Sequence, residues 1–284
     1  MLKRQTEGAV VCPSCGRLVG VRDERCYNCG RWNPGLWGFA PLLRRLGNDL
    51  GFVSLIIGGC SVLYAVTLLL SGAGAFTMNG LMEILSPTTL PVLQFGASGS
   101  VPVYTLGRWW TILSAGWLHG GLLHILFNML WVRQLAPAAA EIYGPGRTVI
   151  IYTVAGACGF LLSSSAWLIP GFSGAGLTLG ASASIFGLLG ALVCYGRKGV
   201  SSAMTSQVIS YAVVLFVFGF VMPGVDNFAH AGGFAGGYLA ALVLNPLRPE
   251  RQEHLLGGLV CLVLVALSVV ASLLTPIPAW IFGG

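Results

Sequence analysis

Charged side chains are scarce in this sequence. Asp, Glu, Lys and Arg together make up only 8% of the 284 residues, whereas hydrophobic residues make up 55%. A soluble globular protein carries about 25% charged residues, so this composition cannot cover the surface of a soluble fold. Residues 148–196 contain no Lys, Arg, Asp, Glu or His. Because about 20 apolar residues span a bilayer, this run must hold more than one membrane-spanning helix.

Acidic residues are fewer than basic ones, which gives a formal net charge of +6. The basic residues stand at the start of the chain and in short segments between apolar runs. That distribution is typical of membrane topology rather than of a phosphate-binding face, and we expect no nucleic-acid partner. The apolar runs predict an all-α polytopic membrane protein with seven spans, at about residues 52–70, 117–139, 148–168, 181–195, 206–221, 226–244 and 255–274.

The basic residues also predict how the chain crosses the lipid bilayer. Eight of them lie before residue 50, and five of the later ones lie in alternate connecting segments: Arg147, Arg197, Lys198, Arg248 and Arg251. The intervening connections carry only Arg108. By the positive-inside rule, we expect a cytosolic N-terminus and a C-terminus outside. We expect this multi-pass protein in a bacterial plasma membrane.

Residues 1–35 hold two Cys-x-x-Cys pairs that are ten residues apart: Cys12, Cys15, Cys26 and Cys29. A glycine, Gly16 or Gly30, follows each pair and lets the backbone turn around a metal. Four thiolates at this spacing suit a tetrahedral, structural Zn²⁺, and structural disulfides are uncommon in the cytosol. The spacing therefore predicts a zinc-ribbon-like module that metal stabilises. A reduced, disordered tail or a redox pair would have the same spacing.

The rest of the chain divides by composition. Residues 36–50 read as a juxtamembrane linker, 51–245 as a core of six spans, and 246–284 as an additional span with a tail. Within the core, residues 71–108 are too apolar for an ordinary solvated loop, so we expect this segment to lie partly in the membrane. The zinc-ribbon-like module could dock a cytosolic protein partner or regulate the core.

Three of the predicted spans carry polar groups at one common depth. Polar groups inside membrane spans are costly and are candidates for function. They lie near the end at which each span would enter from outside: His119, His124, Asn128, Ser182, Asp226 and His230. Taken singly, each has an ordinary structural explanation, such as a serine that caps a helix. Together, at matched depth, they predict one site.

The chemistry of these groups is that of a serine hydrolase. A serine hydroxyl is a weak nucleophile that needs an adjacent base, and His230 is the candidate base for Ser182. The oxyanion of a tetrahedral intermediate needs hydrogen-bond donors, which His124, Asn128 and the backbone N–H of Ser182 would supply. We expect two pairs of glycines in span 226–244 to bring it against Gly187 and Gly190 of span 181–195. These pairs are Gly232 with Gly236, and Gly233 with Gly237.

Three motifs resemble those of the rhomboid family of intramembrane serine proteases. Residues 119–128 are similar to the family's HxxxxHxxxN stretch, residues 180–183 (Gly-Ala-Ser-Ala) to GxSG, and residues 229–233 (Ala-His-Ala-Gly-Gly) to AHxxG. The resemblance covers roughly residues 52–245. It implies a six-helix catalytic core followed by one additional helix, and a Ser–His dyad without a metal or cofactor. It also implies cleavage of transmembrane protein substrates near their outer end.

The resemblance also implies supporting roles for four residues: His119, Gly180, Gly233 and Phe186, the last as an aromatic ring that stacks on the catalytic histidine. Two departures stand out. Ala183 replaces the last glycine of GxSG, and Trp109-Trp110-Thr111, preceded by Arg108, stands where the family has a Trp-Arg pair. The second departure calls the anchoring of that loop into question, but not the chemistry.

Two other functions would use the same architecture. An inactive relative would bind transmembrane clients without cutting them, although the intact Ser182 and His230 argue against this. A transporter or channel would need polar groups at both membrane faces, whereas these groups lie near only one. Asp226 lies one turn before His230 and could orient it, but a dyad needs no acid.

Overall fold

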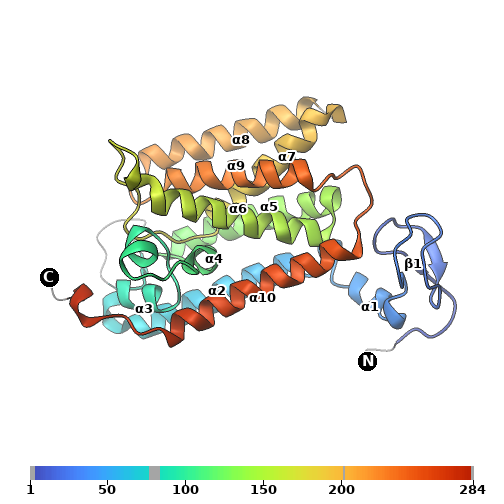
Figure 1. Ribbon diagram of the computed structural model, residues 1–284, viewed down its shortest axis with the longest axis horizontal. Helices are drawn as coiled ribbons and strands as arrows, with labels where there is room; N and C mark the ends of the chain where they lie inside the picture. Colours follow the sequence, from blue (N-terminus) through green and yellow to red (C-terminus); the bar gives the residue numbers. More distant parts are fainter. Residues whose placement is uncertain (1–3, 77–83, 201, 283–284) are drawn as a thin grey trace.

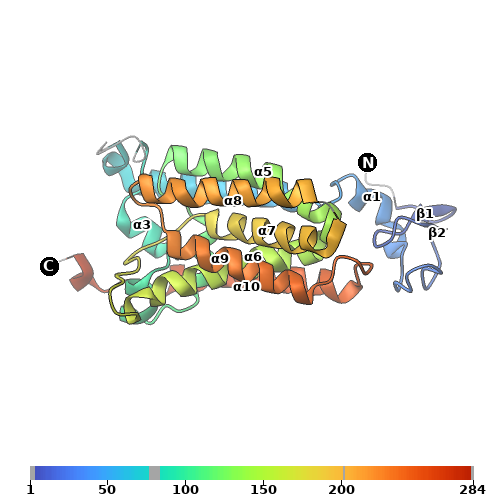
Figure 2. The same ribbon diagram turned by 90° about the horizontal axis from the view of Figure 1, so that it is seen from above.

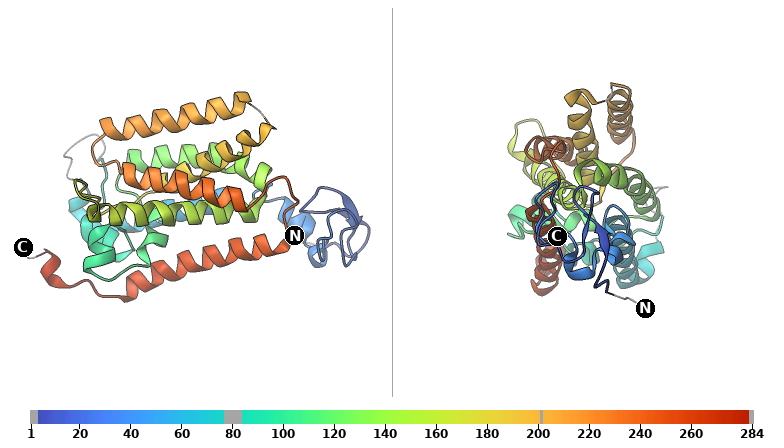
Figure 3. Two further views of the ribbon diagram at one scale, coloured as in Figure 1. Left: turned by 45° about the horizontal axis from the view of Figure 1, so that its top comes forward. Right: turned by 90° about the vertical axis from the view of Figure 1, so that its right-hand side faces the viewer.

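The computed structural model describes residues 4–76, 84–200 and 202–282, and it shows a small N-terminal module beside a bundle of long helices (Figure 1). We call the end of the bundle that lies next to this module the proximal end, and the opposite end the distal end. The long helices run side by side between these two ends (Figure 3).

The N-terminal module is built on a two-stranded antiparallel hairpin, β1 (Ala9–Val11) and β2 (Leu18–Gly20). A 3₁₀ turn, η1 (Leu36–Gly38), and a short helix, α1 (Ala40–Arg44), connect it to the bundle. The hairpin buries only a few side chains, chiefly Val10, Val19 and Val21 with two of the cysteines. So small a core contributes little to stability, because segments below about 40 residues usually need a metal or disulfides.

Seven long helices form the bundle, and each overlaps one of the predicted spans. They are α2 (Phe52–Ser71), α5 (Leu122–Tyr143), α6 (Pro145–Ser165), α7 (Ser182–Tyr195), α8 (Ser202–Val221), α9 (Asn227–Val243) and α10 (Gln252–Leu274). The predicted all-α fold, with a core of six helices and a seventh after it, is thereby confirmed.

Length and composition alone identify fewer membrane spans than the sequence predicted. Four stretches qualify in the described part of the chain: Phe52–Phe76, Pro145–Leu168, Ser202–Val221 and Gln252–Leu274. A fifth arises if Thr111–Trp117 and Leu122–Tyr143, which meet at 93°, form one bent span. The helices α7 and α9 have only 14 and 17 residues. At 1.5 Å per residue, α7 is about 21 Å long, shorter than the roughly 30 Å hydrocarbon core.

Short helices lie between the long ones and, in η8, after the last of them, and most of them lie at the distal end. They are η2 (Gly72–Phe76), α3 (Thr89–Gln94), η4 (Val101–Thr105), α4 (Thr111–Ser114), η5 (Ala115–Trp117), η6 (Ala166–Leu168), η7 (Gly196–Val200) and η8 (Ala279–Phe282). The segment from α3 to α4 packs against α2 and α10. Part of the loop expected to be embedded, residues 77–83, lies outside the described residues.

The central helix of the bundle is α7. It contacts α5, α6, α8 and α9, and Figure 2 shows it between α8 and α9. Every residue from Ala183 to Cys194 is buried. In contrast, α8 lies at the edge, and Val208 and Gly219 are its only buried residues. A short helix enclosed in this way places its first residue, Ser182, inside the distal half of the bundle.

Glycines let α7 and α9 touch through their backbones. A methyl group on Gly237 would overlap the backbone of Gly187, and one on Gly233 would overlap the carbonyl of Ala183. The second predicted glycine pair faces a different helix, because Gly232 and Gly236 lie against Cys158 of α6. The prediction that both pairs face α7 is therefore wrong. Neighbouring residues in a helix face directions about 100° apart, so one pair contacts α7 and the other contacts α6.

Replacing Gly237 with Val should destabilise the bundle, because the added side chain has no space between α9 and the backbone of Gly187. Overpacking of this kind costs about 1–3 kcal/mol or more. The matched control is Gly58→Val in α2, where an added Cβ would meet no atom within 4 Å. Thermal unfolding in detergent should show a lower midpoint for Gly237→Val than for Gly58→Val, and equal midpoints would contradict the close contact.

Candidate active site

Ser182 is the first residue of α7, and the turn before it is unusual. Gly180 has a φ of +126°, a conformation that side chains disfavour. Its N–H donates to the carbonyl of Ala115 at 2.9 Å. Ser182 is half-buried, whereas its neighbours Ala181 and Ala183 are buried. The N–H of Ser182 begins the helix and therefore has no acceptor within it, so a backbone donor lies beside the serine hydroxyl.

His230 lies on α9 against the same face of α7. Its ring stacks on the ring of Phe186, with centroids 4.2 Å apart and planes 16° apart. Ser182 and Phe186 are four residues apart and share a face of α7, so Ser182 and His230 lie on the same side of the α7–α9 contact. His230 is only 5% exposed. Among the described residues, its Nδ1 atom has no hydrogen-bond partner.

Ala183 lies inside the contact of three helices. Its carbonyl faces Gly233 of α9, and its methyl group faces Gly159 of α6, where an added Cβ would come within 2.8 Å. The methyl group that replaces the usual glycine hydrogen is thus accommodated because position 159 is a glycine. This explains how the chain tolerates its departure from the GxSG motif.

His124 approaches the same turn from α5. An added Cβ on Gly180 would lie 2.5 Å from Nε2 of His124, so only glycine leaves room for the imidazole ring. The N–H of Gly120 donates to Nδ1 of His124 at 3.3 Å. In a neutral imidazole the other nitrogen then carries the proton. Nε2 of His124 is therefore a hydrogen-bond donor directed at the backbone two residues before Ser182.

Asn128 and His119 both contact His124. The amide of Asn128 donates to the carbonyl of His124 at 2.8 Å, which occupies one of its two N–H groups. His119 is fully buried, and its ring meets that of His124 edge-on at 5.1 Å. Neither ring nitrogen of His119 has a partner among the described residues.

Asp226 does not orient His230. One carboxylate oxygen accepts from the N–H of Ala229 at 3.0 Å, and the other accepts from the hydroxyl of Ser163 at 2.5 Å. Asp226 is therefore the N-cap of α9, and it also links α9 to α6. Ser163 was not predicted as a partner of Asp226, because nothing in the spacing of a serine-rich helix end distinguishes one serine as the partner of a distant carboxylate.

A backbone bridge holds the segment before Ser182. Ser98 and Thr178 exchange two hydrogen bonds, of 3.0 and 2.7 Å, as an isolated antiparallel bridge. Ser100 and Val101 donate to the carbonyls of Ala175 and Gly176. The loop that enters α7 is thus fixed along its length, which gives the turn at Gly180 a defined position.

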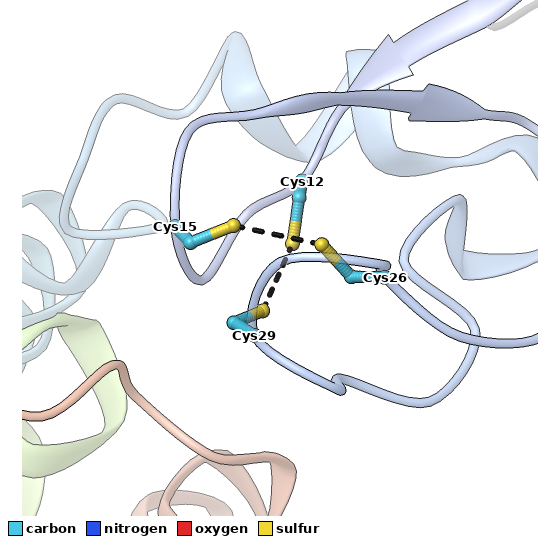
Figure 4. A group of neighbouring side chains, drawn as sticks. All are labelled: Cys12, Cys15, Cys26 and Cys29. Atoms are coloured by element: carbon cyan, nitrogen blue, oxygen red, sulfur yellow. Dashed lines mark hydrogen bonds between the residues drawn. The ribbon is translucent and has the colours of Figure 1, made fainter.

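The four cysteines of the N-terminal module form a second candidate site (Figure 4). Their sulfur atoms lie within 4.8 Å of one another, with 3.7 Å between Cys12 and Cys29 and 3.6 Å between Cys15 and Cys26. Tetrahedral Zn²⁺ with bonds of 2.3 Å separates its sulfur ligands by about 3.8 Å, so the geometry fits a bound metal. Gly16 and Gly30 have φ near +70°, as predicted for the turns after each pair.

The module lies next to the proximal end of the bundle (Figure 1). Arg31 of the module is 5% exposed, and Glu250, just before α10, is 6% exposed. Burial raises the pKa of Glu250, while the backbone N–H and charge of Arg147 and the charge of Arg31 oppose this rise. The charge of Arg31 is therefore close enough to Glu250 to favour the ionised form of that carboxyl.

The distal constellation has the parts of a nucleophilic site. It combines a half-buried hydroxyl at a helix N-terminus, an imidazole on the facing helix, and two N–H donors around one turn. These groups can add a serine oxygen to a carbonyl and stabilise the resulting oxyanion. The four side chains involved can all be neutral: those of Ser182, His230, His124 and Asn128.

Comparison with known proteins bears on the same region. A family profile described as the Rhomboid domain matches residues 106–247, which is half of the chain. RHOMBOID-like protein 4 of Arabidopsis thaliana is 34% identical over 187 residues, which is 62% of this chain and 45% of that protein. The Rhomboid protease GluP of Bacillus subtilis is 32% identical over 188 residues, covering 65% of this chain and 35% of the relative.

Similarity extends to a protein named as inactive. The Inactive RHOMBOID-like protein 8 of Arabidopsis thaliana is 28% identical over 212 residues, which is 67% of this chain and 58% of its own length. The chain thus spans about half the length of the curated relatives it matches. Its helices α5 to α9 all lie within the matched residues.

Proposed function

The chain belongs to the rhomboid family, and from this premise we propose that it is an intramembrane serine endopeptidase that cleaves transmembrane protein substrates. Ser182 is the nucleophile and His230 is the general base. The observation that carries the proposal is the stack of His230 on Phe186, because it sets the imidazole against the face of α7 that begins with Ser182.

The reaction proceeds in two steps in which the protons balance. The hydroxyl oxygen of Ser182 attacks the scissile carbonyl carbon while His230 takes the hydroxyl proton. The tetrahedral intermediate then collapses, and His230 returns this proton to the departing amine nitrogen. In the second step His230 takes a proton from water, whose oxygen attacks the acyl ester. The proton returns to the oxygen of Ser182 as the ester bond breaks.

The oxyanion is held by donors that belong to different elements. The N–H of Ser182 and the Nε2–H of His124 approach it from α7 and α5, and the second amide N–H of Asn128 completes the set. Donors fixed in this way need no reorganisation during the reaction, and one such donor contributes about 10²–10³ in rate. Gly180 supports them by leaving space for His124, and Gly233 supports them by allowing α9 to approach.

Ser182→Ala and His230→Ala should each abolish cleavage of a fluorogenic transmembrane substrate in liposomes. Loss of a nucleophile or its base lowers the rate by orders of magnitude, about 10³-fold or more. Ser184→Ala serves as the control in the same helix, because Ser184 faces Gly156 of α6, and His254→Ala serves as the control histidine at the proximal end. Cleavage by either active-site variant at the wild-type rate would overturn the assignment.

Gly180→Ala should lower the cleavage rate about 100-fold, because the methyl group displaces His124 and small displacements of positioned groups have effects of this size. The control is Gly176→Ala in the same loop, where the nearest atom to an added Cβ is 4.0 Å away. Both variants would be compared for cleavage and for labelling of Ser182 by a fluorophosphonate. A fully active Gly180→Ala enzyme would exclude His124 from the oxyanion site.

A client-binding protein without activity is the second candidate, and the similarity to a relative named as inactive favours it. The two candidates differ in one measurement. A wild-type protein that binds transmembrane segments in liposomes but neither cleaves them nor reacts with a fluorophosphonate would be the inactive form.

We further propose that Cys12, Cys15, Cys26 and Cys29 bind a structural Zn²⁺ in a cytosolic zinc-ribbon-like module. The sulfur distances and the small hydrophobic core of the module support this. A cytosolic module implies that the N-terminus lies in the cytosol and, with seven spans, that the C-terminus lies outside. The location in a bacterial plasma membrane remains our prediction. The domain boundaries at residues 35, 50 and 245 remain predictions as well, and a cytosolic partner of the module remains a proposal.

Metal analysis of the purified protein should find about one zinc per chain. A strong chelator should then make residues 4–35 sensitive to protease, because binding of the metal provides most of the folding free energy of such modules. Cys12→Ser should do the same, whereas Cys261→Ser in α10 should leave both zinc content and protease resistance unchanged. Zinc-free protein with a protease-resistant module would contradict the proposal.

A further inference from the structure

The distal end of α10 is tied to the loop before α4 by a buried arginine. Arg108 is 1% exposed, and its two terminal nitrogens donate to backbone carbonyls, to Leu93 at 2.8 Å and to Ser272 at 2.6 Å. Leu93 lies in α3 and Ser272 in the last turn of α10. One guanidinium therefore joins two segments that are far apart in the sequence.

The carbonyl of Ser272 is available because of the residue four positions later. In a continuing helix it would accept the N–H of residue 276, but residue 276 is a proline and has no N–H. The side chain of Ser272 adds a second bond by accepting from Nε1 of Trp110 at 3.0 Å, and Ser268 donates to the carbonyl of Trp110 at 2.7 Å. Ser268 and Ser272 are four residues apart and form one polar face of α10.

A continuous set of backbone contacts leads from Arg108 to the candidate nucleophile. The N–H of Arg108 donates to the carbonyl of Pro102 at 2.8 Å, and the adjacent Val101 donates to Gly176 at 3.1 Å. The bridge between Ser98 and Thr178 follows, two residues before Gly180. The loop tied to α10 is therefore the same loop that holds the entry to α7.

We propose that Arg108 is a positioning residue for the active site, and that α10 is the fixed element against which the loop before Ser182 is held. The expected effect on the cleavage rate rests on the proposed protease function. The expected effect on the position of the loop does not. The seventh helix is thus part of the scaffold of the active site, although it contributes no group to the chemistry.

A second buried arginine provides a matched control. Arg147 in α6 is 2% exposed and donates to the carbonyls of Arg248 and Pro249, both at 2.8 Å. It therefore ties the proximal start of α10 through the same kind of bond. Both arginines are buried and donate to backbone carbonyls, and Nε of Arg147 also donates to Nδ1 of His254 at 3.1 Å. Only Arg108 is connected to the loop before Ser182.

The experiment compares Arg108→Lys with Arg147→Lys in full-length protein. Lysine keeps the charge but lacks the planar fork that reaches two carbonyls. In Arg108→Lys, amide hydrogen exchange over residues 175–180 should quicken, and kcat should fall about tenfold or more with little change in KM, since misplacement of the reacting groups affects the chemical step. In Arg147→Lys, exchange over residues 175–180 and kcat should match the wild type.

Ser272→Ala keeps the backbone acceptor and removes only the bond from Trp110, so it should shift exchange in the same direction by less. Ser272→Ala therefore tests the contact between the distal loop and α10 if Arg108→Lys does not fold. Unchanged exchange over residues 175–180 in the folded variants would overturn the proposal, and so would an equal increase in Arg147→Lys. If the wild-type protein cleaves no substrate, the protease function fails, and the exchange comparison still decides the role of Arg108.

Discussion

The contact between the backbones of α7 and α9 is the constraint on which the candidate active site depends. A hydroxyl and an imidazole on two helices can meet only if the helix axes are close, and side chains between the helices would hold them apart. Here Gly187 faces Gly237, and Ala183 faces Gly233. Because lipid gives no hydrophobic driving force between helices, close packing of this kind is what holds them together. The same residues therefore serve both the stability of the bundle and the geometry of the candidate site.

The site that results is built from neutral groups in a region of low dielectric. A buried carboxylate beside His230 would carry a large desolvation cost, and the one carboxylate nearby, Asp226, is instead satisfied by Ala229 and Ser163. The imidazole of His230 is held by an aromatic ring, and that of His124 by a backbone N–H. Orientation thus comes from stacking and from the main chain.

Much of this could be predicted from the sequence, because the relevant signals are local. Hydrophobic runs predicted each long helix, and loop charges predicted that Ser182, His124 and His230 lie at one depth. The cysteine spacing predicted a cluster that the structure confirms. What the sequence missed depends on direction or on distant partners. The spacing of Gly232 and Gly236 does not say which neighbour they face, and one of the two acceptors for Arg108, the carbonyl of Ser272, is 164 residues away.

The choice of arginine at position 108 has a consequence for the conditions in which the fold can work. A guanidinium stays protonated across the whole physiological pH range, and its acceptors here are carbonyls, which do not titrate. The hydrogen bonds of Arg108 that join α10 to the distal loop are therefore the same in an acidic and in an alkaline medium. Any response of this protein to acidity in that range must then arise elsewhere, in groups such as its histidines that gain or lose a proton there.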